Sequence, residues 1–173
     1  METNNQTLIR WTVLTHEDWS LHLAATSQGL CFIGSQQQAF DELAQWANAR
    51  RLPGSSLVRD DAYLQAYADQ LAEYLQGKRQ SLDLPLDYRG TPFQMAVWQA
   101  LREIPYGKTV SYSDIAERIQ RPAAVRAVGA AIGANPVLIA VPCHRVIGKS
   151  GALTGYRGGM DMKTGLLDLE QLT

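Results

Sequence analysis

The sequence predicts a mixed α/β fold of the α+β kind, built from two lobes. In the first half, short apolar runs separated by turn residues precede two segments with helical spacing, which indicates a small antiparallel sheet with helices. In the second half, closely spaced helix signals precede an apolar run that ends at a cysteine. A stretch with proline and glycine at 84–90 lies between the halves, so we expect lobes over 1–88 and 89–173.

The N-terminal lobe is expected to provide structural support. Strands are predicted at Ile9–Leu14, Leu21–Ala25 and Leu30–Ile33, with a turn at Gln28-Gly29, and helices at Asp41–Arg50 and Asp61–Gln76. Gly77 is placed to end the second helix. Cys31 lies in an apolar strand and is interpreted as a small buried hydrophobic residue. No group of residues in this lobe indicates chemistry.

The C-terminal lobe carries strong helix-start signals. Thr91-Pro92-Phe93-Gln94 predicts a capping box with proline at the first helical position, and Ser111-Tyr112-Ser113-Asp114 predicts a second one. Gln120-Arg121-Pro122 predicts a tight corner, and a further helix is expected from about Ala123 to Ile132. Two short helices joined by such a corner are typical of a helix-turn-helix.

The last of these helices is unusually rich in small residues, and its one long polar side chain is Arg126. A helix that reads DNA sequence usually presents several long polar side chains to base edges. The pattern therefore favours binding through shape and phosphates, although close packing against another helix would also explain small residues.

Charge is unevenly distributed along a chain whose net charge is −1. Residues 1–90 hold 7 basic and 11 acidic residues, whereas residues 91–173 hold 9 basic and 6 acidic residues. Between Arg118 and Arg157 there is no acidic residue at all. A basic face of this kind suits a polyanion, unless the acidic half of the chain neutralises it.

The motif Pro142-Cys143-His144-Arg145-Val146 carries the main chemical signal. We expect Val137–Val141 to form a short buried strand that holds the Cys143 thiol rigidly at its end, beside an imidazole. A cysteine is the strongest side-chain nucleophile near neutral pH once it is ionised. Because Cys143 and His144 are neighbours in sequence, their side chains diverge, and a bridging water is more natural than a direct contact.

Several other classes of protein are disfavoured. Two cysteines are too few for a disulfide scaffold, and three histidines without metal-ligand spacing give no support for a metal site. No apolar stretch reaches the roughly 20 residues of a membrane span. The start lacks a signal peptide's basic and apolar regions. We therefore expect a cytoplasmic protein without cofactor or metal, and we further expect it to be a monomer of bacterial type.

At these motifs the C-terminal half resembles the methylated-DNA–protein-cysteine methyltransferases, which repair O6-alkylguanine. The resemblance covers about half of the chain, in order and at plausible spacing. The matching segments are Gly90-Thr91-Pro92-Phe93-Gln94, Ile104-Pro105-Tyr106-Gly107, Ser111-Tyr112, Ala124-Val125-Arg126-Ala127-Val128-Gly129, Asn135-Pro136, Pro142-Cys143-His144-Arg145-Val146 and Gly155-Tyr156-Arg157-Gly158-Gly159.

The resemblance implies a role for each matching residue. Cys143 would be the alkyl acceptor, surrounded by a hydrogen-bond network of His144, Asn135 and Glu170. Tyr112 would donate to the departing guanine. Arg126 would fill the space left by the flipped nucleotide. Further DNA contacts would come from Ala124, Ala127, Gly129, Arg121 and Arg145, and the base pocket from Tyr112, Val146, Tyr156, Arg157 and Gly158.

The implied activity is a stoichiometric, irreversible transfer of the alkyl group from O6-alkylguanine in double-stranded DNA to Cys143. It would follow minor-groove binding and base flipping, and the protein would be nucleoid-associated when bound to DNA. O4-alkylthymine is a second candidate lesion. One residue departs from the family: Gly165 replaces a bulky aromatic residue before Leu166-Leu167, so we expect a weaker helix around Glu170.

Two alternatives stay open at this point. A non-catalytic DNA-damage-binding or regulatory module could use the same fold, but relatives of that kind lack the reactive cysteine. A cysteine hydrolase acting on amides or esters would explain the thiol and imidazole, but it would leave the helix-turn-helix and the acid-free segment unexplained.

Overall fold

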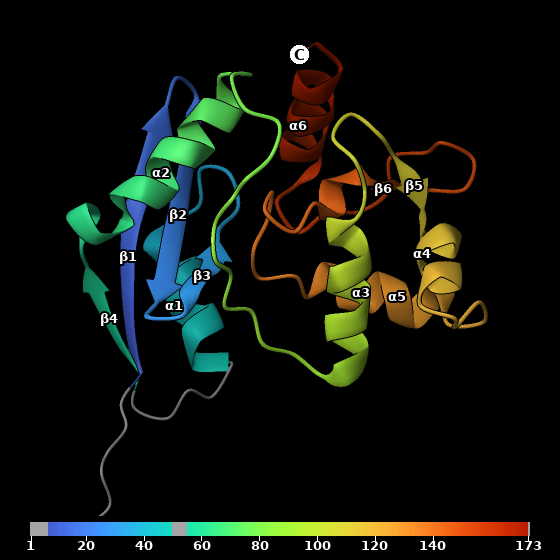
Figure 1. Cartoon of the computed structure of the whole chain (residues 1–173), viewed down its shortest axis with the longest axis horizontal. Helices are drawn as coiled ribbons and strands as arrows, with labels where there is room; N and C mark the ends of the chain where they lie inside the picture. Colours follow the sequence, from blue (N-terminus) through green and yellow to red (C-terminus); the bar gives the residue numbers. More distant parts are fainter. Residues whose placement is uncertain (1–6, 50–54, 173) are drawn as a thin grey trace, which may run out of the picture. The chain divides into compact units, whose positions relative to one another are not determined.

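The computed structural model describes residues 7–49 and 55–172, and the chain divides into two compact units between Tyr88 and Arg89 (Figure 1). Arg50, the expected end of the first helix, lies outside the described residues. In the part of the chain that is described, no helix is both long and apolar enough to cross a membrane. The mixed α/β class expected from the sequence is confirmed.

The first unit is built on a four-stranded sheet with the order β3-β2-β1-β4. The strands are β1 (Leu8–His16), β2 (Trp19–Thr26), β3 (Gly29–Ile33) and β4 (Ser56–Arg59). The first three are antiparallel, as expected, but β4 pairs parallel with β1 and corrects the expectation of a wholly antiparallel sheet. The reason is topological: helix α1 (Phe40–Ala49) separates β3 from β4, which allows the two strands to run in the same direction.

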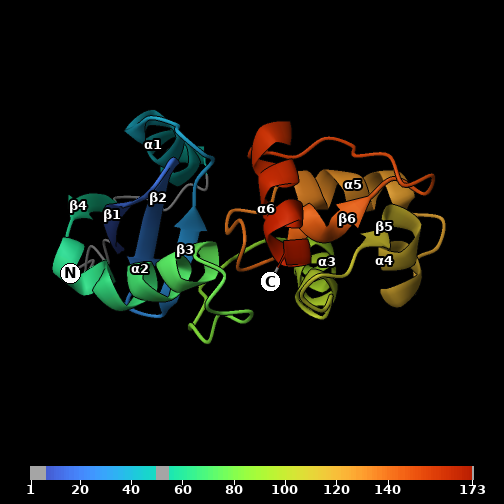
Figure 2. The same cartoon turned by 90° about the horizontal axis from the view of Figure 1, so that it is seen from above.

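Helices α1 and α2 (Asp61–Leu75) cover opposite faces of this sheet (Figures 1 and 2). Leu43 and Ala47 of α1 pack on Ile9 and Phe32 in a buried cluster that also holds Cys31. Cys31 is 3% exposed, as expected for a cysteine in an apolar strand. The Asp60 side chain accepts a hydrogen bond from the Tyr63 amide and so caps α2.

The second unit is mostly helical. Its elements are α3 (Pro92–Arg102), β5 (Val110–Ser111), α4 (Tyr112–Arg118), α5 (Val125–Gly133), the 3₁₀ turn η1 (Cys143–Arg145), β6 (Val146–Ile147) and α6 (Met160–Leu172). Strands β5 and β6 form a short parallel pair. Trp98 of α3 is fully buried and donates to the carbonyl of Ala131, 2.8 Å away, which links α3 to α5.

The helix-turn-helix forms from α4 and α5, and both expected capping boxes are present at Thr91 and Ser111. Gln120 adopts a left-handed backbone conformation, with φ of 60°, at the corner between the two helices. Helix α5 begins at Val125, two residues later than expected. The preceding residues form a turn instead, in which the Ala124 amide donates to the Arg121 carbonyl.

The apolar run 137–141 is buried but forms turns, which corrects the strand expected before the cysteine. The Val141 amide donates to the carbonyl of Val137, 3.0 Å away, and Ile139 has a positive φ of 71°. A continuous apolar run cannot reveal such a turn, because the turn is closed by the Asn135 side chain, which donates to the Val141 carbonyl and accepts from the Val137 amide. The segment that precedes Cys143 is therefore a tightly folded loop and not the edge of a sheet.

Candidate active site around Cys143

Asn135 fixes both the loop and the sulfur of Cys143. Its Nδ2 donates to the Val141 carbonyl at 2.9 Å and to Cys143 Sγ at 3.2 Å, while its Oδ1 accepts from the Val137 amide at 2.9 Å. Asn135 is completely buried, so these contacts satisfy a side chain that water cannot reach. The amide therefore positions the thiol and closes the turn that carries it.

Burial decides the protonation of the thiol. Cys143 is 2% exposed, and this desolvation raises the pKa of its thiol. The hydrogen bond from Asn135 opposes the shift, as do the positive charges of Arg157 and Lys163. Because desolvation is the largest effect, Cys143 rests as a neutral thiol that must lose its proton when it reacts.

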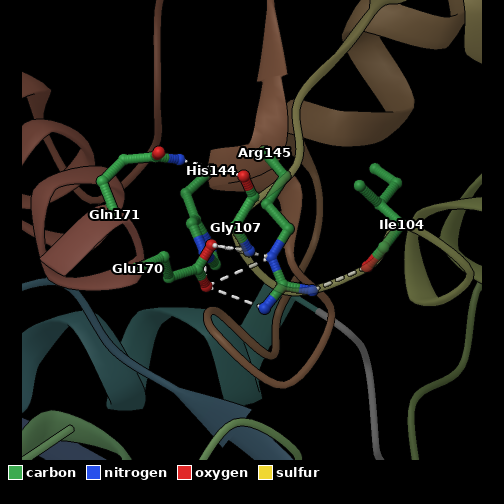
Figure 3. Close-up of polar contacts among 6 residues, drawn as sticks. All are labelled: Ile104, Gly107, His144, Arg145, Glu170 and Gln171. Carbon is green, nitrogen blue, oxygen red and sulfur yellow. Dashed lines mark hydrogen bonds and ion pairs between the residues drawn. The ribbon is translucent and has the colours of Figure 1, made fainter. Parts of the chain in front are cut away.

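Glu170 organises a buried network beside the cysteine (Figure 3). Its Oε1 lies 2.9 Å from His144 Nε2, and both its oxygens accept from Arg145, the shortest contact being 2.7 Å from Nη2. Its Oε2 also accepts from the Gly107 amide at 3.3 Å. Arg145 Nη1 donates to the Ile104 carbonyl at 2.7 Å. One carboxylate thus holds an imidazole, a guanidinium and a loop amide in place.

His144 is completely buried, and desolvation lowers its pKa. Glu170 opposes this shift, but the adjacent positive charge of Arg145 supports it. The imidazole is therefore neutral at pH 7, and its Nε2–H donates to Glu170. Among the described residues Nδ1 has no hydrogen-bond partner, so its lone pair can accept a proton.

Two sequence expectations concern this network. The weaker helix expected from Gly165 stays a prediction, although α6 continues through Gly165 and Glu170 contacts His144 and Arg145. Arg145, expected to contact DNA, is 8% exposed and bound to Glu170. Its burial contradicts that expectation. A charge at this position is needed inside the unit to balance Glu170, which the pattern of basic residues alone could not show.

A cavity of about 290 Å³ opens beside the sulfur. Its lining combines aromatic rings with the small residues of α5 and with the loop after β6: Tyr112, Gly129, Ile132, Gly133, Cys143, Gly155, Tyr156 and Arg157. Arg157 Nε donates to the Asn135 carbonyl at 3.0 Å, which ties this loop to the turn under the thiol. The cavity is apolar on most sides, and Tyr112, Tyr156 and Cys143 share its lining.

Two residues expected in the pocket do not line the cavity. Val146 is fully buried and is not among the lining residues. Gly158 packs so closely that a Cβ atom there would lie 2.5 Å from Met162 Sδ and 2.7 Å from Tyr156 Cε1. A side chain at this position would force Met162 or Tyr156 to move, so the contribution of Gly158 to the pocket is indirect.

Sequence reasoning missed Lys163. Its side chain is completely buried, and Nζ donates to the carbonyls of Val146 at 2.7 Å and Thr154 at 3.1 Å. Desolvation lowers the pKa of this ammonium. A signal was present: Lys163 lies three residues before Leu166 and seven before Glu170, on the buried face of α6.

The second helix of the helix-turn-helix, α5, exposes mostly small side chains. Arg126 and Ala127 are exposed on α5, as is Arg121 in the corner before it, while Ala124 and Gly129 are partly buried.

No group of three or more His, Cys, Asp or Glu side chains within residues 7–49 and 55–172 could hold a metal ion.

Fold and site define a two-unit protein whose second unit combines a helix-turn-helix with a buried cysteine that lines a cavity. Two family models match. The DNA-binding domain of 6-O-methylguanine DNA methyltransferase matches residues 92–172, and the ribonuclease-like domain of the same family matches residues 9–88. The chain therefore belongs to the 6-O-methylguanine DNA methyltransferase family.

Individual proteins and structures that are similar to this chain support the same family. The inducible methylated-DNA–protein-cysteine methyltransferase of Bacillus subtilis is 61% identical over 171 residues, covering 99% of this chain and 94% of the relative. The crystal structure of Mycobacterium tuberculosis OGT in complex with DNA superposes with a TM-score of 0.80 at 40% identity, covering 95% and 93% of the two chains. A methyltransferase from Pyrococcus kodakaraensis, at 24% identity and a TM-score of 0.71 over 94% and 98%, shares the fold.

Proposed function

We propose that this chain repairs DNA by moving an alkyl group from O6 of guanine to Sγ of Cys143, once per molecule. The observation that carries the proposal is the placement of Cys143. Its sulfur lines a cavity with Tyr112 and Tyr156, accepts a hydrogen bond from Asn135, and belongs to the same 3₁₀ turn as an imidazole held by Glu170. The names of the relatives support the same reaction.

The surface of α5 supports binding to double-stranded DNA in the minor groove. Ala127 and its small neighbours leave a smooth helix face that can approach the duplex closely, and phosphates can be met by Arg121. Arg126 is exposed on the same helix and would enter the base stack where the damaged nucleotide leaves. Flipping the base costs a few kcal/mol, and the inserted guanidinium offsets part of that cost.

The neutral thiol requires a base at the moment of attack. The Cys143 S–H proton would pass through a water molecule to Nδ1 of neutral His144, and Glu170 would stabilise the imidazolium. The sulfur lone pair would form the S–C bond while the C–O6 bond breaks and its electrons go to the guanine. Tyr112 would supply a proton to the departing base and recover one from solvent, so that guanine and S-alkyl-Cys143 are the products.

Ionisation of the sulfur supplies a small part of the acceleration. An ordinary thiol is already a few per cent thiolate at pH 7, so full ionisation gains about 30-fold, or ~2 kcal/mol. The larger contributions would come from alignment of the alkyl carbon with Sγ in the cavity and from the Tyr112 hydroxyl at the departing base. The product is a thioether, and no described residue is placed to hydrolyse it.

Intact-protein mass spectrometry tests the proposal. After incubation with a duplex that contains O6-methylguanine, the protein should gain the mass of one methylene unit, located on the peptide with Cys143. Cys31→Ser is the matched control because Cys31 is the other buried cysteine, in the first unit, and this variant should react normally. Cys143→Ser should bind the duplex and gain no mass.

An unchanged mass for the wild-type chain would contradict alkyl transfer. If the chain still bound lesion-bearing duplex, the damage-binding alternative would replace it. The proposal extends to O4-alkylthymine as a second lesion and to action as a monomer on nucleoid DNA in the cytoplasm. Competition with lesion-bearing oligonucleotides and sedimentation of the DNA complex test these two parts.

A further inference from the structure

Tyr112 is held from two sides. It is the first residue of α4, and its ring lies beside α5, where a Cβ atom at Gly129 would be 3.9 Å from Cδ1 and 4.0 Å from Cε1. On the other side its hydroxyl meets the loop after β6, because Thr154 Oγ1 donates to Tyr112 Oη at 2.9 Å. The packing sets the ring plane, and the hydrogen bond acts on the oxygen.

Thr154 is itself anchored. Its carbonyl accepts from Lys163 Nζ at 3.1 Å, and the same ammonium binds the Val146 carbonyl at 2.7 Å. Lys163 belongs to α6 and is completely buried, so the two ends of the loop between Val146 and Thr154 are fixed by one cation. The Thr154 hydroxyl is thus presented to Tyr112 from a defined position.

The direction of the hydrogen bond matters for the chemistry. A phenol oxygen has one proton and two lone pairs, so it can accept from Thr154 through a lone pair. With Thr154 as the donor, the proton of Tyr112 is free for an acceptor in the cavity. A phenol that already accepts one hydrogen bond also has fewer orientations open to its own proton.

We infer that Thr154 is a positioning residue that aims the Tyr112 hydroxyl proton into the cavity beside Cys143. The inference rests on the proposed function, because the acceptor for that proton is the departing guanine. Thr154 itself does not line the cavity, although the next three residues do. Its role is thus exerted through Tyr112 and not through contact with the base.

The test compares Thr154→Val, which keeps the shape and loses the hydroxyl, with Thr154→Ser, which keeps the hydroxyl. Thr154 is exposed, so neither variant threatens folding. The single-turnover rate of methyl transfer at saturating O6-methylguanine duplex should fall about five-fold in Thr154→Val, the factor of one ordinary hydrogen bond, with DNA affinity unchanged. Thr154→Ser should stay within about two-fold of the wild type.

A double-mutant cycle separates positioning from general loss of packing. In a Tyr112→Phe background, Thr154→Val should cause no further slowing, because the hydroxyl it acts on is gone. Additive losses, or a Thr154→Ser variant as slow as Thr154→Val, would overturn the inference. So would a faster Thr154→Val, since it would mean that Thr154 holds the phenol proton away from the cavity.

A readout without lesion DNA keeps the two proposals distinct. The ¹³Cζ resonance of Tyr112, assigned through Tyr112→Phe, should shift in Thr154→Val and stay in place in Thr154→Ser. A shift with no methyl uptake by the wild-type chain would reject the proposed function and leave the contact established. Normal methyl uptake with an unmoved resonance in Thr154→Val would reject the role of Thr154 alone.

Discussion

The two units of the chain differ in whether their ion pairs are exposed or buried. In the first unit, ion pairs lie at the surface, as in Arg59–Asp61, whose side chains are 55% and 61% exposed. In the second unit, Arg145 and Glu170 form a pair that is 9% and 1% exposed. Surface pairs add little to stability, whereas a buried pair is costly to desolvate and costly to break. The buried ion pair thus lies in the unit that also contains Cys143.

Removing the charge of Glu170 should have the largest effect on stability. Glu170→Gln keeps the shape but leaves the Arg145 guanidinium without a counter-charge, so the free energy of unfolding should fall by about 3 kcal/mol or more. The matched control is Glu73→Gln, which breaks the surface pair with Arg79 and should cost less than about 1 kcal/mol. Urea titrations measure both losses. Equal losses would contradict the expected difference between the buried pair and the surface pair.

Asn135→Asp should slow methyl transfer, and it should also lower the free energy of unfolding, because the Val141 carbonyl loses its donor and a carboxylate is buried. The carboxylate can still accept from the Val137 amide, but it no longer donates to Cys143 Sγ and adds a negative charge beside it. The pKa of the Cys143 thiol should rise further, and the rate at pH 7 should fall about 10-fold or more. Rapid-quench time courses measure the rate.

The pH dependence of this variant gives a second check. With a higher thiol pKa, the thiolate fraction keeps growing with pH, so part of the lost rate should return near pH 9. Asn48→Asp, at an exposed position of α1, is the control for an added negative charge and should react at the wild-type rate. Equal slowing by both variants would speak against a local effect at the sulfur.

Acid should destabilise the fold through His144. Desolvation lowers the pKa of this folded imidazole below the value of 6.5 in the unfolded chain. As the pH falls through 6.5, His144 takes up a proton in the unfolded chain but not in the folded one. The free energy of unfolding therefore decreases below that pH. The slope from His144 can reach at most ~1.4 kcal/mol per pH unit.

Urea titrations at pH 7.5 and 5.5 measure this loss, and His144→Gln should reduce it. His22, in the first unit, also has a pKa lowered by desolvation, but it is only partly buried. His22→Gln should therefore change the slope less. A larger change from His22 than from His144 would reverse the contrast between the units.

The smallest expected effects are at the helix caps, where the two units should behave alike. Thr91→Ala removes the cap of α3, and Asp60→Ala removes the cap of α2. Each should lower the free energy of unfolding by about 1 kcal/mol. Thermal or urea unfolding checks this, and a strong asymmetry would show that local helix signals also differ between the units.

Local signals were sufficient to predict much of this fold. The capping boxes at Thr91 and Ser111 and the corner at Gln120 depend on residues within a few positions of one another, and each lies where the sequence indicates. The network around Cys143 was predicted through the resemblance to a family, because no local pattern links Asn135 to Cys143 or Glu170 to His144.

Features set by tertiary contacts could not be predicted. The run 137–141 is apolar enough for a strand, but it forms turns that are held by one hydrogen bond donated by Asn135 and one accepted by it. Arg145 counted as a basic residue for DNA until its burial against Glu170 was known. Lys163 looked like an ordinary helical lysine, although it binds two carbonyls inside the unit.

The contact between Trp98 and the Ala131 carbonyl has an optical consequence. The chain's other tryptophans, at positions 11, 19 and 46, all precede residue 89. In a chain with those three replaced by phenylalanine, Trp98 would be the one tryptophan, and excitation that avoids the tyrosines would report on it alone. Because its indole N–H is bonded to α5, emission wavelength and lifetime would register any displacement of that helix as nucleic acid arrives, in real time and without an attached dye.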